Sequence, residues 1–234
     1  MTAAKSLRWE RRPDRRPQEL LDAALAVFAE RGYRNTRIDD VAEAAGVTKG
    51  AVYHYFATKE ELLLRAIEHY HDRAFGQIDE VLRDARGPAS ARIRLMMRKA
   101  FGGADPTGQK MTLALILQSV RHDLPAAHQQ WLRGGPIKGW RLLASLIEEG
   151  KRVGEFRADA DAEVAARMAI SGLITQIIWQ PLAVDVPELL IDDDRLIDSA
   201  VELLLHSLWP AILVNTTDTT DTTDTTDTTD TTEN

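Results

Sequence analysis

The sequence predicts an all-α protein with a small N-terminal helical unit followed by a larger helical region. Three observations support this prediction. Apolar residues recur at i, i+3 and i+4, the spacing of one helix face, from about residue 18 to residue 214. Helix-capping residues such as Thr48 and Thr58 stand where these stripes begin. Glycine or proline stands where they end or break, as at Gly46 and at Gly134-Gly135-Pro136.

The N-terminal unit is predicted to open with a helix over Gln18–Arg31, whose apolar stripe ends at Gly32. Residues 36–59 then have the pattern of two short helices joined by a tight turn, with a third helix starting at the end. Three threonines are candidate N-caps: Thr36, Thr48 and Thr58, the last forming a capping box with Glu61. Gly46 occupies the position of a left-handed residue that ends a helix.

The second short helix has two faces of different character. At about 100° per residue, one face collects side chains that should pack inward: Ala51, Val52, Tyr55 and Phe56. The other face carries Gly50, Tyr53 and His54, with Lys49 on its flank. Glycine is less favourable than alanine in a helix by about 1 kcal/mol. An outward glycine therefore makes sense where a phosphate backbone or a base edge must come close.

These residue types predict a DNA-contacting helix. Lys49 and Lys59 would bracket its outer face with positive charge, and the hydroxyls of Thr36, Thr48 and Tyr53 would position phosphates. His54 points where the base edges of the major groove would lie, so we expect it to read sequence. Tyr55 is expected in the core, although its hydroxyl could also reach a phosphate.

The same residues resemble the DNA-binding domain of the TetR family of transcriptional regulators. The matching features are Phe28, Gly32, Thr36, Ile38, Val41, Ala42, Ala45–Val47, Lys49–Phe56 and Lys59–Leu62. The resemblance covers about residues 15–74. It implies a three-helix DNA-binding domain whose third helix enters the major groove. It also implies a C-terminal helical domain that dimerises through its last two long helices and binds a small ligand.

The remaining helical patterns are expected in chain order. The predicted helices cover residues 59–86, a segment after Gly87-Pro88, residues 109–122, and residues 125–153 with a break at Gly134-Gly135-Pro136, followed by 161–181 and 191–214. Residues 102–108 are expected to form a loop. The helix from Lys59 would connect the two parts of the molecule, so it is the natural lever for a ligand signal. The last two helices are apolar over more than one narrow stripe, and such faces need burial on a second side.

No catalytic constellation, cofactor motif or metal site stands out, so we expect a protein that is not an enzyme. His69 and His71 would point about 200° apart on a helix, which prevents them from sharing one metal from one face. Several methionine, leucine and aromatic residues could line a pocket for a hydrophobic effector or could equally be ordinary core: Met97, Phe101, Met111, Leu115, Trp131, Trp140 and Trp179.

Composition agrees with a DNA-binding protein in a reducing compartment. The 234-residue chain has no cysteine, and we found no signal segment or long apolar stretch, so we expect cytoplasmic localisation and no membrane partner. The net charge is −7, yet residues 1–60 carry eleven Lys and Arg against nine Asp and Glu. The local charge matters for DNA more than the sum over the chain.

Four regions follow from these patterns. Residues 1–16 form a basic arm that either contacts DNA or is a solvated, disordered terminus. Residues 17–58 form the helix-turn-helix domain, with the family module extending to about residue 74. Residues 59–214 form the helical regulatory and dimerisation domain. Residues 215–234, which repeat Thr-Thr-Asp, form a disordered tail.

The predicted function is a ligand-responsive transcriptional regulator. We expect a homodimeric repressor that a small hydrophobic effector releases from a near-palindromic operator in double-stranded DNA. The alternative is a helical ligand-binding or interaction protein with little sequence-specific DNA binding.

Overall fold

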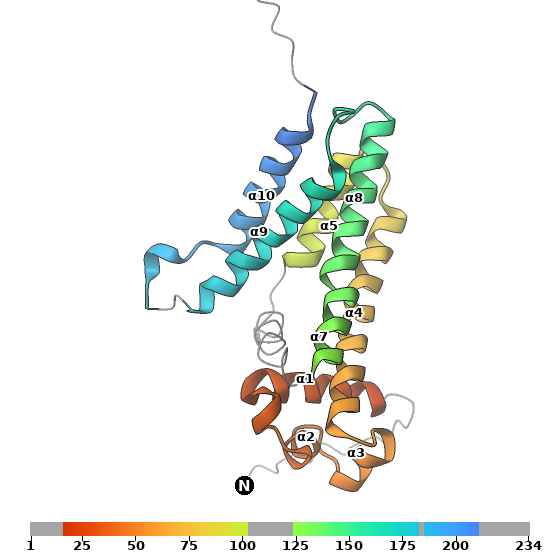
Figure 1. Ribbon diagram of the computed structural model, residues 1–234, viewed down its shortest axis with the longest axis vertical. Coiled ribbons are helices and arrows are strands. Elements are labelled where there is room, and N and C mark those ends of the chain that lie inside the picture. Colours follow the sequence, from red (N-terminus) through yellow and green to blue (C-terminus); the bar gives the residue numbers. More distant parts are fainter. Residues whose placement is uncertain (1–15, 103–123, 183–184, 211–234) are drawn as a thin grey trace, which may run out of the picture.

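The computed structural model describes residues 16–102, 124–182 and 185–210, and these residues are mainly helical (Figure 1). The helices are α1 (Arg16–Asn35), α2 (Ile38–Ala44), α3 (Lys49–Tyr55), α4 (Lys59–Asp84), α5 (Ala89–Phe101), α7 (Pro125–Gly134), α8 (Pro136–Arg152), α9 (Ala162–Leu182) and α10 (Asp193–Leu208), with a 3-10 turn η2 (Pro187–Leu189) before α10. Outside the described residues lie residues 1–15 of the expected arm, residues 103–122 of the loop and helix expected over 102–122, and the Thr-Thr-Asp tail.

A first hydrophobic core holds α1, α2, α3 and the first half of α4 together. Its most buried members include Phe28, Val41, Val52, Leu62 and Ile67. The straight part of α1 ends at Gly32, whose φ of 76° lies in the left-handed region that favours glycine. The predicted end of the first helix is therefore confirmed, although a further short turn follows the bend.

The start of α4 shows the predicted capping arrangement with one difference. Thr58 Oγ1 accepts a hydrogen bond from the Glu61 amide at 3.0 Å. The Glu61 carboxylate reaches back to the amide of Ala57, at 2.8 Å, rather than to that of Thr58. Thr58 thus satisfies one of the four free amides at the start of α4, which is 26 residues long.

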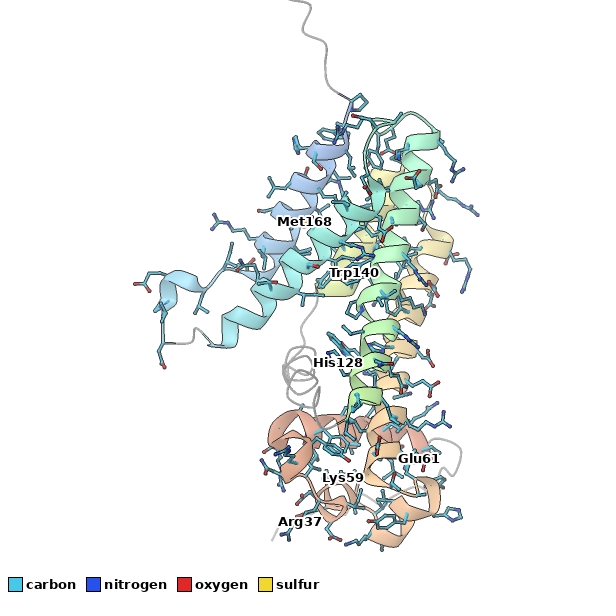
Figure 2. All side chains as sticks on the ribbon, viewed as in Figure 1. Arg37, Lys59, Glu61, His128, Trp140 and Met168 are labelled. Atoms are coloured by element: carbon cyan, nitrogen blue, oxygen red, sulfur yellow. The ribbon has the colours of Figure 1, made fainter. Side chains whose placement is uncertain are left out.

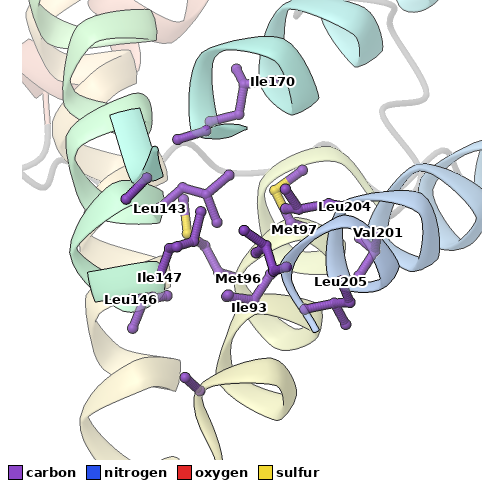
Figure 3. Packing of buried hydrophobic residues seen from close by; sticks show 14 of the residues in the cluster. Ile93, Met96, Met97, Leu143, Leu146, Ile147, Ile170, Val201, Leu204 and Leu205 are labelled. Carbon is purple, nitrogen blue, oxygen red and sulfur yellow. The ribbon is translucent and has the colours of Figure 1, made fainter. Parts of the chain in front are cut away.

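A second core lies at the other end of α4 and joins α5, α8, α9 and α10 (Figure 3). Its buried side chains include Phe75, Ile93, Met97, Leu143 and Leu205. Two bidentate ion pairs tie α5 to α10 at its rim: Arg94 with Glu202, and Arg98 with Asp198. The division between the cores falls within α4, between Ile67 and Phe75.

The predicted break at Gly134-Gly135-Pro136 is confirmed, since α7 ends at Gly134 and α8 begins at Pro136. The break separates two helices with different partners. Leu124 and Ala127, at the start of α7, are buried in the first core, and Trp131 packs against it. Helix α8 packs into the second core instead. Helix α4 and the α7–α8 pair therefore contribute to both cores.

His71 occupies the joint between the two cores. It lies on α4 between Ile67 and Phe75, is only 6% exposed, and its ring rests on Gly134 and Gly135. A Cβ atom built on Gly134 would lie 2.3 Å from His71 Nδ1. Burial lowers the pKa of His71 to about 4. Within the described residues, α4 and the α7–α8 corner both connect the two cores, and they meet at this neutral imidazole.

Helices α9 and α10 pack against each other beside the α4–α8 column (Figure 1). The expectation that the last helix runs to residue 214 is wrong for the part that the structure describes, because α10 ends at Leu208. Pro210 explains this end, since a proline disfavours the helical conformation of the residue before it. Arg157 binds the end of α10 from outside: its amide donates to Leu208 O at 2.8 Å, and its Nε donates to Ser207 O at 3.0 Å.

Candidate nucleic-acid interface

The turn between α2 and α3 is set by local backbone hydrogen bonds. The Val47 amide donates to Ala42 O at 2.9 Å and the Gly46 amide donates to Glu43 O at 3.0 Å. Gly46 has a φ of 65°, so it is the left-handed residue that the sequence predicts at this helix end. This turn fixes the direction in which α3 leaves α2.

Helix α3 is anchored on one side and open on the other. Val52 is fully buried and Phe56, just past the helix end, is 7% exposed. Thr48 caps the helix as predicted, with its Oγ1 accepting from the Ala51 amide at 3.3 Å. On the outer side Gly50, Tyr53 and His54 are exposed. The predicted orientation of these three residues is confirmed.

Gly50 has no packing partner that would require a glycine. A Cβ atom at this position would meet only Thr48 Oγ1, at 3.9 Å, which is an ordinary contact. The backbone φ of Gly50 also lies outside the left-handed region. Nothing that the structure describes around residue 50 therefore explains the glycine.

Tyr55 departs from the predicted inward face. It is 39% exposed, and its ring lies against the edge of His54 at a centroid distance of 5.1 Å. Tyr55 sits about 60° around the helix from Val52 and is the last residue of α3. A side chain at the edge of the buried stripe and at the end of a seven-residue helix is left uncovered.

Thr36 is not the N-cap of α2, contrary to our prediction. It is 1% exposed, and its hydroxyl donates to Gly32 O at 2.7 Å, so it is not offered to a phosphate. Arg37 is the N-cap residue, and the Asp40 carboxylate accepts from the Arg37 amide at 2.7 Å. This backbone hydrogen bond, assisted by Arg31, lowers the pKa of Asp40.

The two lysines that were expected to bracket α3 have different environments. Lys49 is exposed and forms an ion pair with Asp39 at 2.8 Å, and this hydrogen bond raises the pKa of Lys49. Lys59 is turned inward: its ammonium donates to Tyr33 O at 2.8 Å and to Thr36 O at 3.0 Å. Burial lowers the Lys59 pKa. Lys59 thus binds α4 to the end of α1 rather than facing outward.

Arg37 is a candidate that the sequence analysis missed. Its side chain is exposed at the start of α2, at the same end of the molecule as α3 (Figure 2). Within the described ranges, its guanidinium forms no ion pair. A basic residue directly before the first apolar residue of α2 was visible in the sequence, but the mistaken assignment of the N-cap to Thr36 hid its position.

Comparison with known proteins agrees with this arrangement. The sequence profile of the family described as "Bacterial regulatory proteins, tetR family" matches residues 20–66. The HTH-type transcriptional repressor KstR2 of Rhodococcus jostii is 30% identical over 165 residues, which are 70% of this chain and 79% of that protein.

The chain belongs to the TetR family. It is a DNA-binding transcriptional regulator of the ligand-responsive repressor type, in a family of regulators rather than enzymes. The fatty acid metabolism regulator protein of Bacillus subtilis is 26% identical over 161 residues, 68% of this chain and 80% of that protein. The crystal structure of FadR from Bacillus subtilis in complex with stearoyl-CoA has the same fold, with a TM-score of 0.65 at 24% identity over 82% of this chain and 98% of that one.

The residues expected to line an effector pocket of this TetR-family regulator do not share one environment. Met97 is fully buried in the second core, and Phe101 and Trp140 pack half-buried against it. Trp131 packs against the first core, next to His71. Met111, Leu115 and the side chain of Trp179 lie outside the described residues.

The last two helices of the regulator expose apolar side chains. Val164 and Met168 on α9 are 54% and 72% exposed, and Leu203 on α10 is 73% exposed. Within residues 16–102, 124–182 and 185–210, no group of three or more His, Asp or Glu side chains could hold a metal ion. In the same residues, no helix is long and apolar enough to cross a membrane.

Proposed function

We propose that this TetR-family regulator is a homodimeric repressor whose two α3 helices enter successive major grooves of a near-palindromic operator. The observation that carries the proposal is the outer face of α3, where Gly50, Tyr53 and His54 are exposed while Val52 and Phe56 hold the helix in place. Two such helices in one dimer would read half-sites about 10 bp apart or slightly more.

The proposed dimer forms through α9 and α10. Val164, Met168 and Leu203 support it, because they expose large apolar side chains on two helices that pack against each other, and apolar patches of this kind mark protein–protein contacts. Residues 17–58, extended by the family module to about 74, would then carry DNA binding, and the later helices would carry dimerisation and effector binding.

The DNA contacts divide into two classes. His54 reads base edges, and Tyr53, Thr48 and Lys49 position the phosphates around it. Arg37 joins the phosphate class, because it presents an exposed guanidinium at the same end of the molecule. Tyr55 joins it through its exposed hydroxyl. Thr36 and Lys59 donate hydrogen bonds to backbone carbonyls inside the domain, so we do not include them among the proposed DNA contacts.

The proposed effector is a small hydrophobic compound bound against the second core. Three features support this choice: the buried Met97, the half-buried Phe101 and Trp140 beside it, and a relative named for fatty acid metabolism. Binding would favour a dimer in which the spacing of the α3 helices no longer matches the operator, and DNA affinity would fall.

Fluorescence anisotropy over a series of salt concentrations tests the proposal. An operator selected from a random duplex library serves as the specific site, and a scrambled duplex serves as the non-specific one. His54→Ala should reduce the preference for the operator by about 1–3 kcal/mol. Lys49→Ala and Arg37→Ala should weaken binding to both duplexes and lower the salt slope by about 0.9 each.

Lys99→Ala is the matched control, because Lys99 is an exposed lysine on α5, far from α3 in the fold. It should leave the salt slope unchanged. If no duplex is bound at low salt, or if the control lowers the slope as much as Lys49→Ala does, the proposal fails. Binding of apolar compounds without any DNA binding would favour the helical ligand-binding protein instead.

A further inference from the structure

Trp140 carries a buried hydrogen-bond donor without an acceptor. Its indole Nε1 is shielded from solvent and has no hydrogen-bond partner among the residues that the structure describes. An indole nitrogen can only donate, so it needs an acceptor from outside its own side chain. Leaving such a donor buried and unpaired is unfavourable, because its hydration is lost and nothing replaces it.

The other buried nitrogens without a hydrogen bond have carboxylates beside them. His69 Nε2 lies 3.4 Å from an Asp22 carboxylate oxygen. The guanidinium of Arg92 binds Glu149 through its terminal nitrogen at 2.6 Å, although its Nε is unpaired. Small movements would satisfy both groups. Trp140 is neutral, and within the described residues its Nε1 makes no hydrogen bond.

The surroundings of Trp140 combine an apolar wall with a cation. Trp140 lies on α8 in the region where α8 packs against α9 and α5 (Figure 2). The helices are close there, since a Cβ atom on the preceding Gly139 would lie 3.6 Å from Ile170 Cδ1. The Arg167 guanidinium lies 5.1 Å from the centre of the Trp140 ring and is ion-paired with Glu163. This arrangement places a donor, a positive charge and the second core together.

We infer that Trp140 recognises the effector, by donating its indole N–H to a carbonyl or carboxylate oxygen at the polar end of an apolar molecule. The apolar part of that molecule would contact the second core. A cationic head group without an acceptor oxygen could not accept this hydrogen bond, so it would gain nothing from the indole N–H. The inference rests on the proposed function, which supplies the effector, and adds the chemical class that the effector belongs to.

Three probes of equal chain length test this class: decanoate, methyl decanoate and decyltrimethylammonium. The first two carry an acceptor oxygen and the third carries a cation without one. Binding to the full-length protein is measured by calorimetry. Decanoate and methyl decanoate should bind more tightly than decyltrimethylammonium. Trp140→Phe keeps an aromatic ring and removes the donor, so it should weaken the two acyl probes by about five- to tenfold and leave the cation unchanged.

Indole nitrogen NMR separates hydrogen bonding from a general loss of packing. The protein has five tryptophans, and the indole resonance of Trp140 is the one absent from the Trp140→Phe spectrum. It should move downfield when methyl decanoate is added to the wild type. Trp209→Phe is the matched control, since Trp209 is 41% exposed at the end of α10 and should not change probe affinity.

Three results would overturn the inference: no probe binds, Trp140→Phe binds the acyl probes as tightly as the wild type, or the Trp140 resonance does not move. Because calorimetry and NMR use no DNA, their outcome is independent of operator binding. Failure to bind any duplex would therefore contradict the proposed repressor function, but it would leave the role of Trp140 to be decided by calorimetry and NMR.

Discussion

Replacing Gly134 by alanine should damage the joint between the two cores. The added Cβ atom would lie 2.3 Å from His71 Nδ1 and 3.0 Å from His71 Cγ and Cε1. All three distances are shorter than an ordinary van der Waals contact, and the first cannot persist. The His71 ring is 6% exposed and packs beside Trp131, so it must leave its buried position to make room for the methyl group.

The expected loss of stability is about 1–3 kcal/mol, which is the usual effect of forcing an extra methyl group into a packed site. Urea unfolding followed by tryptophan fluorescence measures it. Gly76→Ala is the matched control on α4, because nothing lies within 4 Å of a Cβ atom at residue 76. This control should be stabilised by about 0.5–1 kcal/mol, since alanine is the better helix former.

A double-mutant cycle tests whether the loss comes from the His71 contact. In a His71→Ala background the ring is gone, so adding Gly134→Ala should have little further effect. The reasoning is refuted if Gly134→Ala unfolds at the same urea concentration as the wild type. It is also refuted if the loss is just as large in the His71→Ala background.

Three further predictions concern single residues. Gly50→Ala should stabilise α3 by up to about 1 kcal/mol, measured by thermal unfolding, and should weaken operator binding, measured by anisotropy. Unchanged DNA affinity would show that no external surface approaches residue 50. Lys59→Met should destabilise the protein by about 1–3 kcal/mol, because two backbone carbonyls lose their hydrogen-bond donor. The salt slope of DNA binding by the folded variant should equal that of the wild type. A lower slope would show that Lys59 contacts DNA. The pKa of His71 is about 4 in the folded protein, against an ordinary value of 6.5, so the fold favours the neutral imidazole. Its contribution to the free energy of unfolding is complete above about pH 6.5 and falls by at most about 3 kcal/mol as the pH drops to 4. Urea unfolding at each pH should therefore show a smaller pH dependence for His71→Gln than for the wild type.

The parts of the fold that were predicted correctly depend on neighbouring residues. The turn at Gly46, the cap at Thr48 and the break at Gly134-Gly135-Pro136 each involve groups within about one helical turn of each other. The outward face of α3 follows from helix geometry once Val52 is buried. Such features can be derived from the sequence, because the chain itself holds the interacting groups close together.

The predictions that failed at the DNA-binding end involve choices between partners. Thr36 had a local role available as an N-cap, yet its hydroxyl binds Gly32 O within the bend of α1. Lys59 could have faced solvent, but it binds the carbonyl of Tyr33, 26 residues earlier in the chain. Tyr55 was assigned to the core by the helix period, which does not say where packing against neighbours stops.

The sequence by itself determined that the chain is helical, where most helices begin and end, and which face of α3 is open. Only the tertiary structure decided that α7 packs into the first core, that His71 rests on Gly134 and Gly135, and that Trp140 Nε1 is left without an acceptor. Helix formation is governed by the period of apolar residues and by caps, which act over a few residues. The choice of a packing partner depends on shape and on polar groups brought together from distant parts of the chain, and no local pattern encodes it.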